Sequence, residues 1–486
     1  MALKEIELGS YSRNEDAGEL EPFISRSEYR EGKHAADEFS NRLSSDPLPP
    51  RRGFGLYRFV RYTGLNVYRR IFTAVFIING LVAYHVITKK RRSKYSPLLV
   101  DISTAASANL MLAILIRQDY ILNILFRICW WVPFWMPLRI RRSLAKIYEF
   151  GGLHSGTAVC SLLWFTLLTV ILTWEWMAIR IRDTFVILSS YTIAILLFAM
   201  VISAYPEIRI VWHNTFEVLH RFGGWIILIL FFPELWLFTR ALGHQAGPLS
   251  PGAILHKLPA FWILCITTFH VALPWMRLRR LRTEAEHLGV GVHAIRLHFK
   301  EKVPHCVVYR IADAPLKEWH SFACIPKADQ TGSSIIVSNA GDWTRKTINN
   351  PKKSYYTRGI PTVGVLCMAR IFRKVIIVTT GSGIGPCLGT MLFIPKTTCR
   401  VIWSTPTPRL TFGDELVDNV LSVDPDAVIV DTEKEGRPDL VVLTFNLYKE
   451  TGAEAVFCVS NRKVTKHVVY ELECRGIPAF GPVWDS

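Results

Sequence analysis

Two groups of residues in this chain have the types and spacing that redox cofactors require. His154 and His220 each lie near the start of an apolar stretch long enough for a membrane helix. If the two helices run in the same direction, the imidazoles lie at equal depth and can ligate one iron from opposite faces of a haem. Burying an unpaired ionisable residue in such a segment is costly, so the pair is a functional candidate. The alternative for each histidine alone is an interfacial residue that bonds a headgroup or a backbone carbonyl.

The second group is a glycine-rich loop that follows a buried strand. Residues 374–379 read Lys-Val-Ile-Ile-Val-Thr and lead into Gly381, Gly383 and Pro386, after which a helical stretch begins. Glycines at a strand-to-helix turn let the backbone approach a pyrophosphate, whose charge then faces the helix N-terminus. Pro386 suits the first turn of a helix, where its missing N–H is not needed. The loop therefore predicts a dinucleotide site.

The next strand indicates which dinucleotide binds. Residues 400–404 end without the acidic residue that would select NAD through its ribose hydroxyls, and Arg409 follows nearby. An arginine suits a 2′-phosphate, so the sequence favours NADPH over NADH.

The elements that must position these groups begin with six apolar stretches. They are Ile71–Thr88, Leu98–Ile116, Ser155–Met177, Thr184–Tyr205, Phe222–Thr239 and Leu258–Met276. Each is close to the length that a helix needs to cross a bilayer. A seventh stretch, Tyr120–Leu138, is interrupted by prolines and rich in tryptophan, which predicts an interfacial helix.

Charge and composition set the topology and exclude other classes of protein. The 486 residues are 50% hydrophobic with a net charge of +17, and the basic residues gather beside the apolar stretches. We assign these residues to topology and anionic lipid headgroups rather than to nucleic acid. The basic flanks predict an integral membrane protein with six helices and both termini in the cytosol, in a plasma membrane or an endomembrane. Ten scattered cysteines without a CxxC pair indicate neither a disulfide framework nor a zinc site.

The remaining sequence reads as a soluble module of two parts. Short alternating segments at Val292–Phe299, Cys306–Ile311, Ser334–Val337 and Thr362–Leu366 have the pattern of a small antiparallel barrel. We therefore expect four regions. They are a disordered cytosolic tail (1–55), a transmembrane domain (56–282), a barrel (283–369) and an α/β nucleotide-binding domain (370–486).

Two runs that lead into the histidines resemble a known family. Residues 209–220, from Arg209 to His220, and residues 141–154, which end in Gly-Gly-Leu-His, look like the approaches to helices five and three of the ferric reductase and NADPH oxidase flavocytochromes. The resemblance implies a ferric reductase-like transmembrane domain followed by a ferredoxin reductase-like module. It covers roughly residues 60–486 and is most similar to the fungal TmpA-type membrane FAD-binding proteins.

The family carries a second histidine 13 or 14 residues after each of these two, and this chain does not. Leu168 follows His154, and Pro233 and Glu234 follow His220, at the corresponding positions. About 13 residues of helix rise about 20 Å, so the missing pair would have held a second haem closer to the outer face. Without that pair, electrons have no second haem on the way to the outer face. At most one haem b is implied, held by His154 and His220, with His270 as a reserve ligand.

The resemblance also assigns flavin-binding residues in the run Trp319–Ala323. His320 and Phe322 match the family's FAD motif, in which a His, an aromatic residue and a hydroxyl pack against the flavin. Ser321 stands where Pro is usual, and Ala323 where Ser or Thr would offer a hydroxyl to the flavin N5. FAD binding should survive this loss better than catalysis does. The alternative is an edge strand with an incidental His-x-Phe.

Three further residues are implied in the nucleotide domain. Arg437, within Gly-Arg-Pro-Asp, matches a run that contacts the nucleotide, although an isolated arginine is more often a surface residue. Cys458 corresponds to the cysteine of a Cys-Gly-Pro run beside the nicotinamide and is the candidate catalytic residue, but Val459 and Ser460 replace the Gly and Pro. Trp484, near the end of the chain, is a candidate to stack on the flavin or to close a hydrophobic seam.

These expectations define one leading function and two alternatives. The leading hypothesis is an NAD(P)H-dependent oxidoreductase that passes electrons from cytosolic NADPH through FAD to one haem b and then to an unidentified acceptor or partner enzyme. The first alternative is a catalytically weakened membrane flavoprotein that serves as a redox sensor, scaffold or signalling component. The second is a channel or transporter with a nucleotide-binding tail, which is disfavoured because the helices lack a broken pair or a repeated polar pathway.

Overall fold

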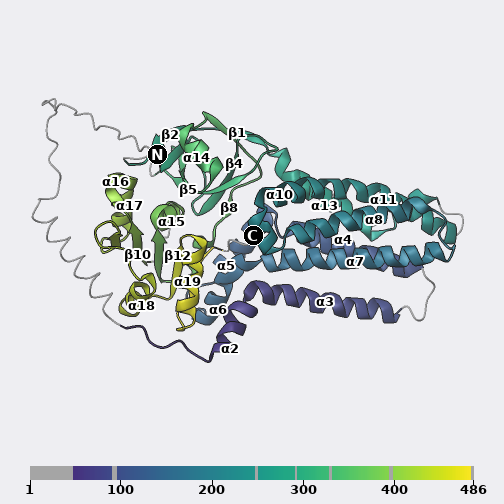
Figure 1. Ribbon diagram of the computed structural model, residues 1–486, viewed down its shortest axis with the longest axis horizontal. Coiled ribbons are helices and arrows are strands. Elements are labelled where there is room, and N and C mark those ends of the chain that lie inside the picture. Colours follow the sequence, from purple (N-terminus) through teal and green to yellow (C-terminus); the bar gives the residue numbers. More distant parts are fainter. Residues whose placement is uncertain are drawn as a thin grey trace, which may run out of the picture.

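The computed structural model describes residues 47–89, 96–246, 250–289, 293–327, 331–392 and 398–482. It consists of an elongated helical bundle and, at one end of it, a module that contains all the strands (Figure 1). The bundle helices are α3 (Val67–Lys89), α4 (Ser96–Leu115), α7 (Gly151–Met177), α8 (Thr184–Ser203), α11 (Gly224–Ala246) and α13 (Pro259–Met276). Among the described residues, six helical segments are long and apolar enough to cross a membrane, and they match the six predicted stretches.

The first part of the strand-containing module is an antiparallel sheet of eight strands. They are β1 (Arg279–Arg282), β2 (Glu284–His287), β3 (Ala294–Phe299), β4 (Val307–Ala312), β5 (His320–Pro326), β6 (Ser333–Ser338), β7 (Ser354–Thr357) and β8 (Thr362–Val363). The order is β1-β7-β4-β5-β6-β3-β2, with β8 paired to β4. The two end strands are separated in sequence by Thr283 alone, so the sheet curls into a nearly closed barrel. The barrel begins at Arg279, inside the range predicted for the transmembrane domain.

The second part is a five-stranded parallel sheet covered by helices. Its order is β11 (Val428–Asp431), β10 (Thr398–Thr405), β9 (Lys374–Thr380), β12 (Ala455–Val459) and β13 (Ala479–Phe480). The helices are α15 (Ile384–Met391), α16 (Pro408–Phe412), α17 (Asp414–Val423), α18 (Leu440–Thr451) and α19 (Arg462–Glu473). The chain order reverses between β9 and β12, which makes this the switch point where doubly wound sheets bind ligands. A barrel followed by this sheet is a ferredoxin reductase-like module, as the sequence predicted.

The linker between α4 and α7 joins the two halves and differs from the prediction. It contains α5 (Asp119–Trp130), α6 (Leu138–Leu144) and a 3-10 turn (Ala145–Glu149). Phe126, Cys129 and Ala145 are buried in the same hydrophobic cluster as the nucleotide sheet, and Asn123 bonds the backbone of Pro361 and Val363. One face of α5 therefore packs on protein rather than lying only at a membrane surface, while Trp131 remains exposed.

Two arginines from the groups assigned to lipid headgroups, Arg141 and Arg51, instead bind carboxylates of the nucleotide domain. Arg141 is buried and makes two hydrogen bonds to Glu454, at 2.7 and 2.9 Å. Arg51 binds Glu471 in the same two-pronged way. The chain around Arg51 is thus ordered on α19, which corrects the predicted disordered tail for residues 47–55; residues 1–46 lie outside the described residues.

We expect Arg141→Met to lower the free energy of unfolding by about 3 kcal/mol, because Glu454 would keep a partly buried charge without its partner. The measurement is thermal unfolding followed by tryptophan fluorescence. Arg139→Met, which changes an exposed arginine of the same helix, is the matched control. Equal melting temperatures for the two variants would contradict the assigned role of the pair.

Candidate functional site

The two candidate haem ligands lie close together at the end of the bundle that adjoins the module. His154 is in the first turn of α7, and His220 is in a π-helical turn (Leu219–Gly223) that leads into α11. Their ring centroids are 6.2 Å apart, with the ring planes at 64°. Imidazole nitrogens bind metals at about 2 Å, which separates the centroids of two opposed rings by about 6 Å. The pair therefore has the spacing of two axial ligands.

Hydrogen bonding favours one nitrogen of His154 as a ligand. Its Nδ1 lies 2.8 Å from the carbonyl oxygen of Ala113 on α4, which leaves Nε2 available for a metal. Nδ1 of His220 is buried without a hydrogen-bond partner in the described structure. The reserve ligand His270 is instead engaged through Nδ1 with the hydroxyl of Tyr120 at 2.8 Å. The geometry thus favours the pair selected from the sequence.

Close helix packing fixes the position of His154. A Cβ on Gly152 would lie 2.1 Å from the carbonyl oxygen of Tyr68, and a Cβ on Gly156 would lie 3.1 Å from Val75. The hydroxyl of Tyr68 also donates to Ser155 at 2.6 Å. These glycines let α3 cross α7 at backbone contact, so the first turn of α7 is held in place.

An open cavity of about 2490 Å³ extends from the two histidines to the module. Arg117 and Arg209 line it beside the histidines, and their guanidinium groups lie over the rings of Phe150 and Phe216. Burial and the positive charges of Arg310 and Arg209 lower the pKa of Arg117 below its ordinary value. Positive charge beside His154 and His220 suits an anionic ligand, and two arginines here would fit the two carboxylates of a haem.

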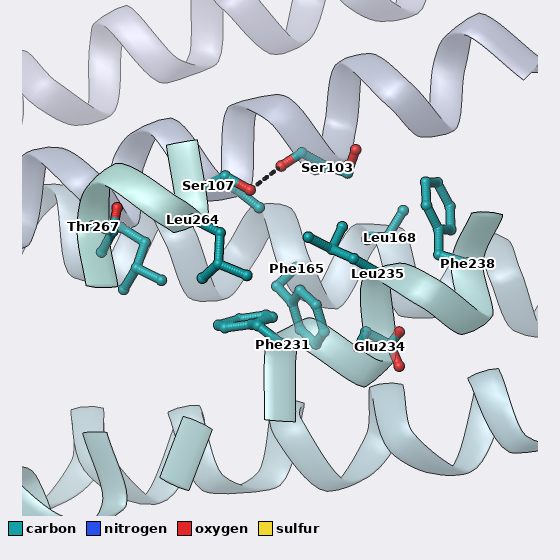
Figure 2. A pocket seen from close by; sticks show the side chains of 12 residues that line it. Ser103, Ser107, Phe165, Leu168, Phe231, Glu234, Leu235, Phe238, Leu264 and Thr267 are labelled. Carbon is teal, nitrogen blue, oxygen red and sulfur yellow. Dashed lines mark hydrogen bonds between the residues drawn. The ribbon is translucent and has the colours of Figure 1, made fainter. Parts of the chain in front are cut away.

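Leu168 and Glu234 stand at the positions where the ferric reductase-like proteins that the sequence resembles carry outer histidines. They line a cavity of only about 30 Å³ together with phenylalanines and leucines (Figure 2). Its lining residues are Ser103, Ala106, Ser107, Leu110, Phe165, Leu168, Phe231, Glu234, Leu235, Phe238, Leu264 and Thr267. Glu234 accepts hydrogen bonds from Ser189 and Ser190 of α8. A space of this volume holds about two waters and has no room for a porphyrin.

The barrel divides the predicted flavin motif between two faces. His320 and Phe322 pair with Ile311 and Tyr309, which are buried in the barrel core, whereas Ser321 pairs with Arg310 on the other face. Successive side chains of a strand point to opposite sides, so Ala323 lies on the face of Ser321. The motif therefore cannot contact a flavin as one continuous set, because strand alternation separates its members.

Trp343 is a site residue that the sequence did not reveal. It lies in α14 (Asp342–Asn349) and stacks on His320 with ring centroids 4.1 Å apart. Burial lowers the pKa of His320, and its Nε2 is buried without a hydrogen-bond partner in the described structure. This nitrogen lies on the face of β5 opposite to Ser321 and Ala323.

The predicted dinucleotide loop has the expected geometry at the switch point. Gly381 has a φ of +49°, and its carbonyl oxygen accepts a hydrogen bond from the buried indole of Trp403 at 3.0 Å. A Cβ on Gly383 would lie 2.5 Å from the carbonyl oxygen of Val459 and 2.6 Å from Oγ1 of Thr379. Pro386 is in the first turn of α15, as predicted. The loop can approach a pyrophosphate because no side chain intervenes.

The structure does not support Cys458 as a catalytic residue. Its side chain is fully buried in the cluster that β12 forms with α18 and α19. Burial raises the pKa of the thiol to about 12, so the reactive thiolate is absent at neutral pH. β12 lies beside the switch point of the sheet, but it directs the side chain of Cys458 into the core.

The other candidate contacts lie at the rim of the sheet. Arg409, in α16 just after β10, bonds Asp414 at 2.7 Å and Asp418 at 2.9 Å. Arg437 is exposed in the loop that follows β11. Both follow carboxyl ends of strands, where a nucleotide would lie. Trp484 lies outside the described residues.

Aromatic side chains join the bundle to the barrel beside the flavin motif. Trp275 of α13 makes edge contacts with Trp225 at 5.2 Å and with Trp319 at 6.2 Å between ring centroids. The guanidinium of Arg358 lies over Trp275 and Trp319, 4.3 and 4.5 Å from their centroids. Burial and nearby arginines lower the pKa of Arg358 to about 10. Arg221, next to His220, donates to two carbonyl oxygens of the loop before β5. This seam brings the haem-ligand segment close to the flavin motif.

The fold and these sites define a helical bundle with a ferredoxin reductase-like module, and comparisons with known proteins add detail. Residues 365–486 match the family model described as the C-terminal domain of adenylate-forming reductase 03009. The chain is 42% identical over 442 residues to adenylate-forming reductase 03009 of Coprinopsis cinerea, and 40% identical over 445 residues to adenylate-forming reductase 06235 of the same fungus. Each match covers 91% of this chain and 42% of the relative. The chain therefore spans less than half the length of these curated relatives.

Solved structures resemble the chain at a lower level. A flavohemoglobin from Malassezia yamatoensis, with bound FAD and heme, aligns with 79% of this chain and 98% of its own, at 14% identity and a TM-score of 0.36. A ferredoxin NADP+ reductase from Neisseria gonorrhoeae, with bound FAD and NADP, aligns with 42% of this chain and 98% of its own, at 13% identity and a TM-score of 0.35.

Proposed function

We propose that this chain is a membrane-bound oxidoreductase that draws electrons from cytosolic NADPH and uses FAD and one haem b. The observation that carries the proposal is the spacing of His154 and His220, whose ring centroids are 6.2 Å apart beside two arginines. The curated relatives are named as reductases, which supports an oxidoreductase. The sequence resemblance to ferric reductase-like and TmpA-type proteins supports the order of the domains.

Each group of residues has a separate role in this proposal. The loop from Gly381 to Pro386 holds the dinucleotide phosphates, and the outer face of β5, with Ser321 and Ala323, adjoins the flavin. His154 and His220 hold the haem iron. When bound, the flavin would accept hydride from NADPH, and the flavin and the haem would transfer single electrons. The ring contacts of Trp275 with Trp225 and Trp319 hold the bundle and the barrel in register.

The acceptor should be reached from the same side of the membrane as NADPH. The cavity at the outer level is about 30 Å³, and only apolar side chains, serines, a threonine and Glu234 line it. A bundle packed in this way offers the electron no second cofactor toward the outer face. We therefore propose an acceptor or partner enzyme at the cytosolic side.

A weakened flavoprotein that acts as a sensor is the second candidate function. Two observations favour it: Ala323 offers no hydroxyl to a flavin, and Cys458 is buried away from any substrate. The test is the absorption spectrum of the purified chain before and after anaerobic addition of NADPH. Haem bands that shift on reduction support the enzyme. A flavin spectrum without haem, unchanged by NADPH, would favour the sensor.

We expect Ala323→Ser to accelerate flavin reduction by NADPH about tenfold, because a new hydroxyl on the outer face of β5 can stabilise the reacting nitrogen. Stopped-flow decay of the flavin absorbance gives the rate. Ser422→Ala, at an exposed serine of α17 in the nucleotide domain, is the control and should leave the rate within about twofold. A rate for Ala323→Ser equal to wild type would place the flavin elsewhere on the barrel.

A further inference from the structure

The short helical segment before α3 exposes an unusual number of apolar side chains. It comprises α2 (Gly55–Arg58) and a π-helical turn (Phe59–Gly64), neither of which buries any residue. Six large apolar side chains from this segment and its flanks are between 41% and 68% exposed; they are Phe54, Leu56, Tyr57, Phe59, Val60 and Leu65. Contiguous exposed apolar surface of this kind marks a contact with a membrane or another molecule. Packing against the rest of the protein does not explain why large apolar residues occupy these positions.

The same segment and the start of α3 carry positive charge, and Glu149 is an acid whose charge interacts with that of Arg70. Arg58, Arg61 and Arg70 direct their guanidinium groups to neutral oxygens, namely the carbonyl of Gly53, the hydroxyl of Tyr57 and the carbonyl of Leu65. The sequence contains no Asp or Glu between Asp46 and Asp101. Arg61, Arg69 and Arg70 also line the open cavity. The segment therefore presents apolar and cationic groups together.

Two fixed neighbours determine where this segment lies. It leads directly into α3, whose residues Val67–Thr88 form the first candidate membrane span (Figure 1). On the other side, the hydroxyl of Tyr62 donates to the carbonyl oxygen of Glu473 at the end of α19, and Arg51 binds Glu471. The segment is thus held between the end of a membrane helix and the nucleotide domain.

We propose that residues 54–65 form an interfacial element that binds anionic phospholipids. The apolar side chains lie at the boundary of headgroups and acyl chains, and Arg58, Arg61, Arg69 and Arg70 contact lipid phosphates. A lipid is the occupant because the segment continues a membrane span and its charge complements an anionic leaflet. The inference rests on the proposed membrane location. Through Tyr62 and Arg51, lipid binding also fixes the nucleotide domain relative to the membrane.

The test uses a fluorescent label on a single introduced cysteine in the full chain reconstituted in nanodiscs. All ten natural cysteines are free thiols, nine of them buried and Cys265 partly so, which permits selective labelling in a Cys265→Ser background. Phe59→Cys reports the segment. Leu410→Cys, at an exposed leucine of the nucleotide domain, is the matched control. Nanodiscs contain either phosphatidylcholine alone or a mixture with phosphatidylserine, each with a spin-labelled headgroup quencher.

We expect the label at position 59 to be quenched several-fold more than the label at 410, and more strongly with phosphatidylserine. Arg61→Gln combined with Arg69→Gln should remove the dependence on phosphatidylserine. Equal quenching of the labels at 59 and 410 would overturn the proposal. Quenching at 59 that is the same with and without phosphatidylserine would also overturn it. Ile195→Cys, on an exposed face of α8, distinguishes the two levels of the argument. For this variant the nanodiscs carry a spin label on the lipid acyl chain. If that quencher does not quench the label at position 195, the proposed membrane location is wrong. If it quenches the label at 195 while the label at 59 is unquenched by headgroup spin labels, only the proposed interfacial element is wrong.

Discussion

His220→Ala should abolish haem binding while FAD remains bound at its wild-type stoichiometry. A haem held by two imidazoles needs both of them, and the ring that faces His154 in the described structure is that of His220. With one of the two imidazole ligands removed, the protein should lose its b-type haem during purification. The measurement is the ratio of haem to flavin absorbance in the purified protein.

His270→Ala is the matched control for this experiment. His270 lies on α13 and bonds Tyr120, so its loss should leave the haem content unchanged. His154→Ala should reproduce the result of His220→Ala, because the two rings act as one site. Haem loss in His270→Ala with retention in His220→Ala would mean that the ligands have been assigned to the wrong helices.

Gly383→Val should reduce the rate of flavin reduction by NADPH about 100-fold. The first carbon of the new side chain would lie 2.5 Å from the carbonyl oxygen of Val459, a backbone atom that cannot move without shifting β12. The loop would have to withdraw from the strands, so its amides would no longer meet the pyrophosphate; a misplaced binding loop costs on the order of 100-fold. Stopped-flow flavin absorbance with NADPH gives the rate.

Reduction by dithionite separates this effect from loss of the flavin. Because dithionite needs no nucleotide site, it should reduce Gly383→Val as completely as wild type. Gly252→Val makes the same change in α12 (Pro251–Leu255), where a Cβ meets no other atom within 4 Å, and should keep at least about half of the wild-type rate. If Gly383→Val and Gly252→Val are reduced by NADPH at the same rate, the loop does not bind the dinucleotide.

The sequence was sufficient where the determining signal is local. Six apolar runs of membrane-helix length predicted six helices, because a helix of that composition satisfies its own backbone hydrogen bonds. Alternating short segments predicted the barrel, and the strand followed by Gly381 and Gly383 predicted the turn at the switch point. The approaches to His154 and His220 indicated a pair, since both lie near the same end of parallel helices. These features depend on residues near one another in the chain.

Only the tertiary structure decided which side chains meet across the chain. Arg141 and Glu454 are separated by 313 residues, and no local pattern distinguishes this arginine from one that contacts lipid. Cys458 lies in the core because β12 turns that face toward α18 and α19, and Trp343 stacks on His320 because α14 packs against β6, the neighbour of β5. Side chains become buried and meet their partners when segments distant in the sequence pack together and exclude water. The sequence by itself determined the elements and the residues that a cofactor needs, whereas long-range packing determined the direction in which each of those residues faces.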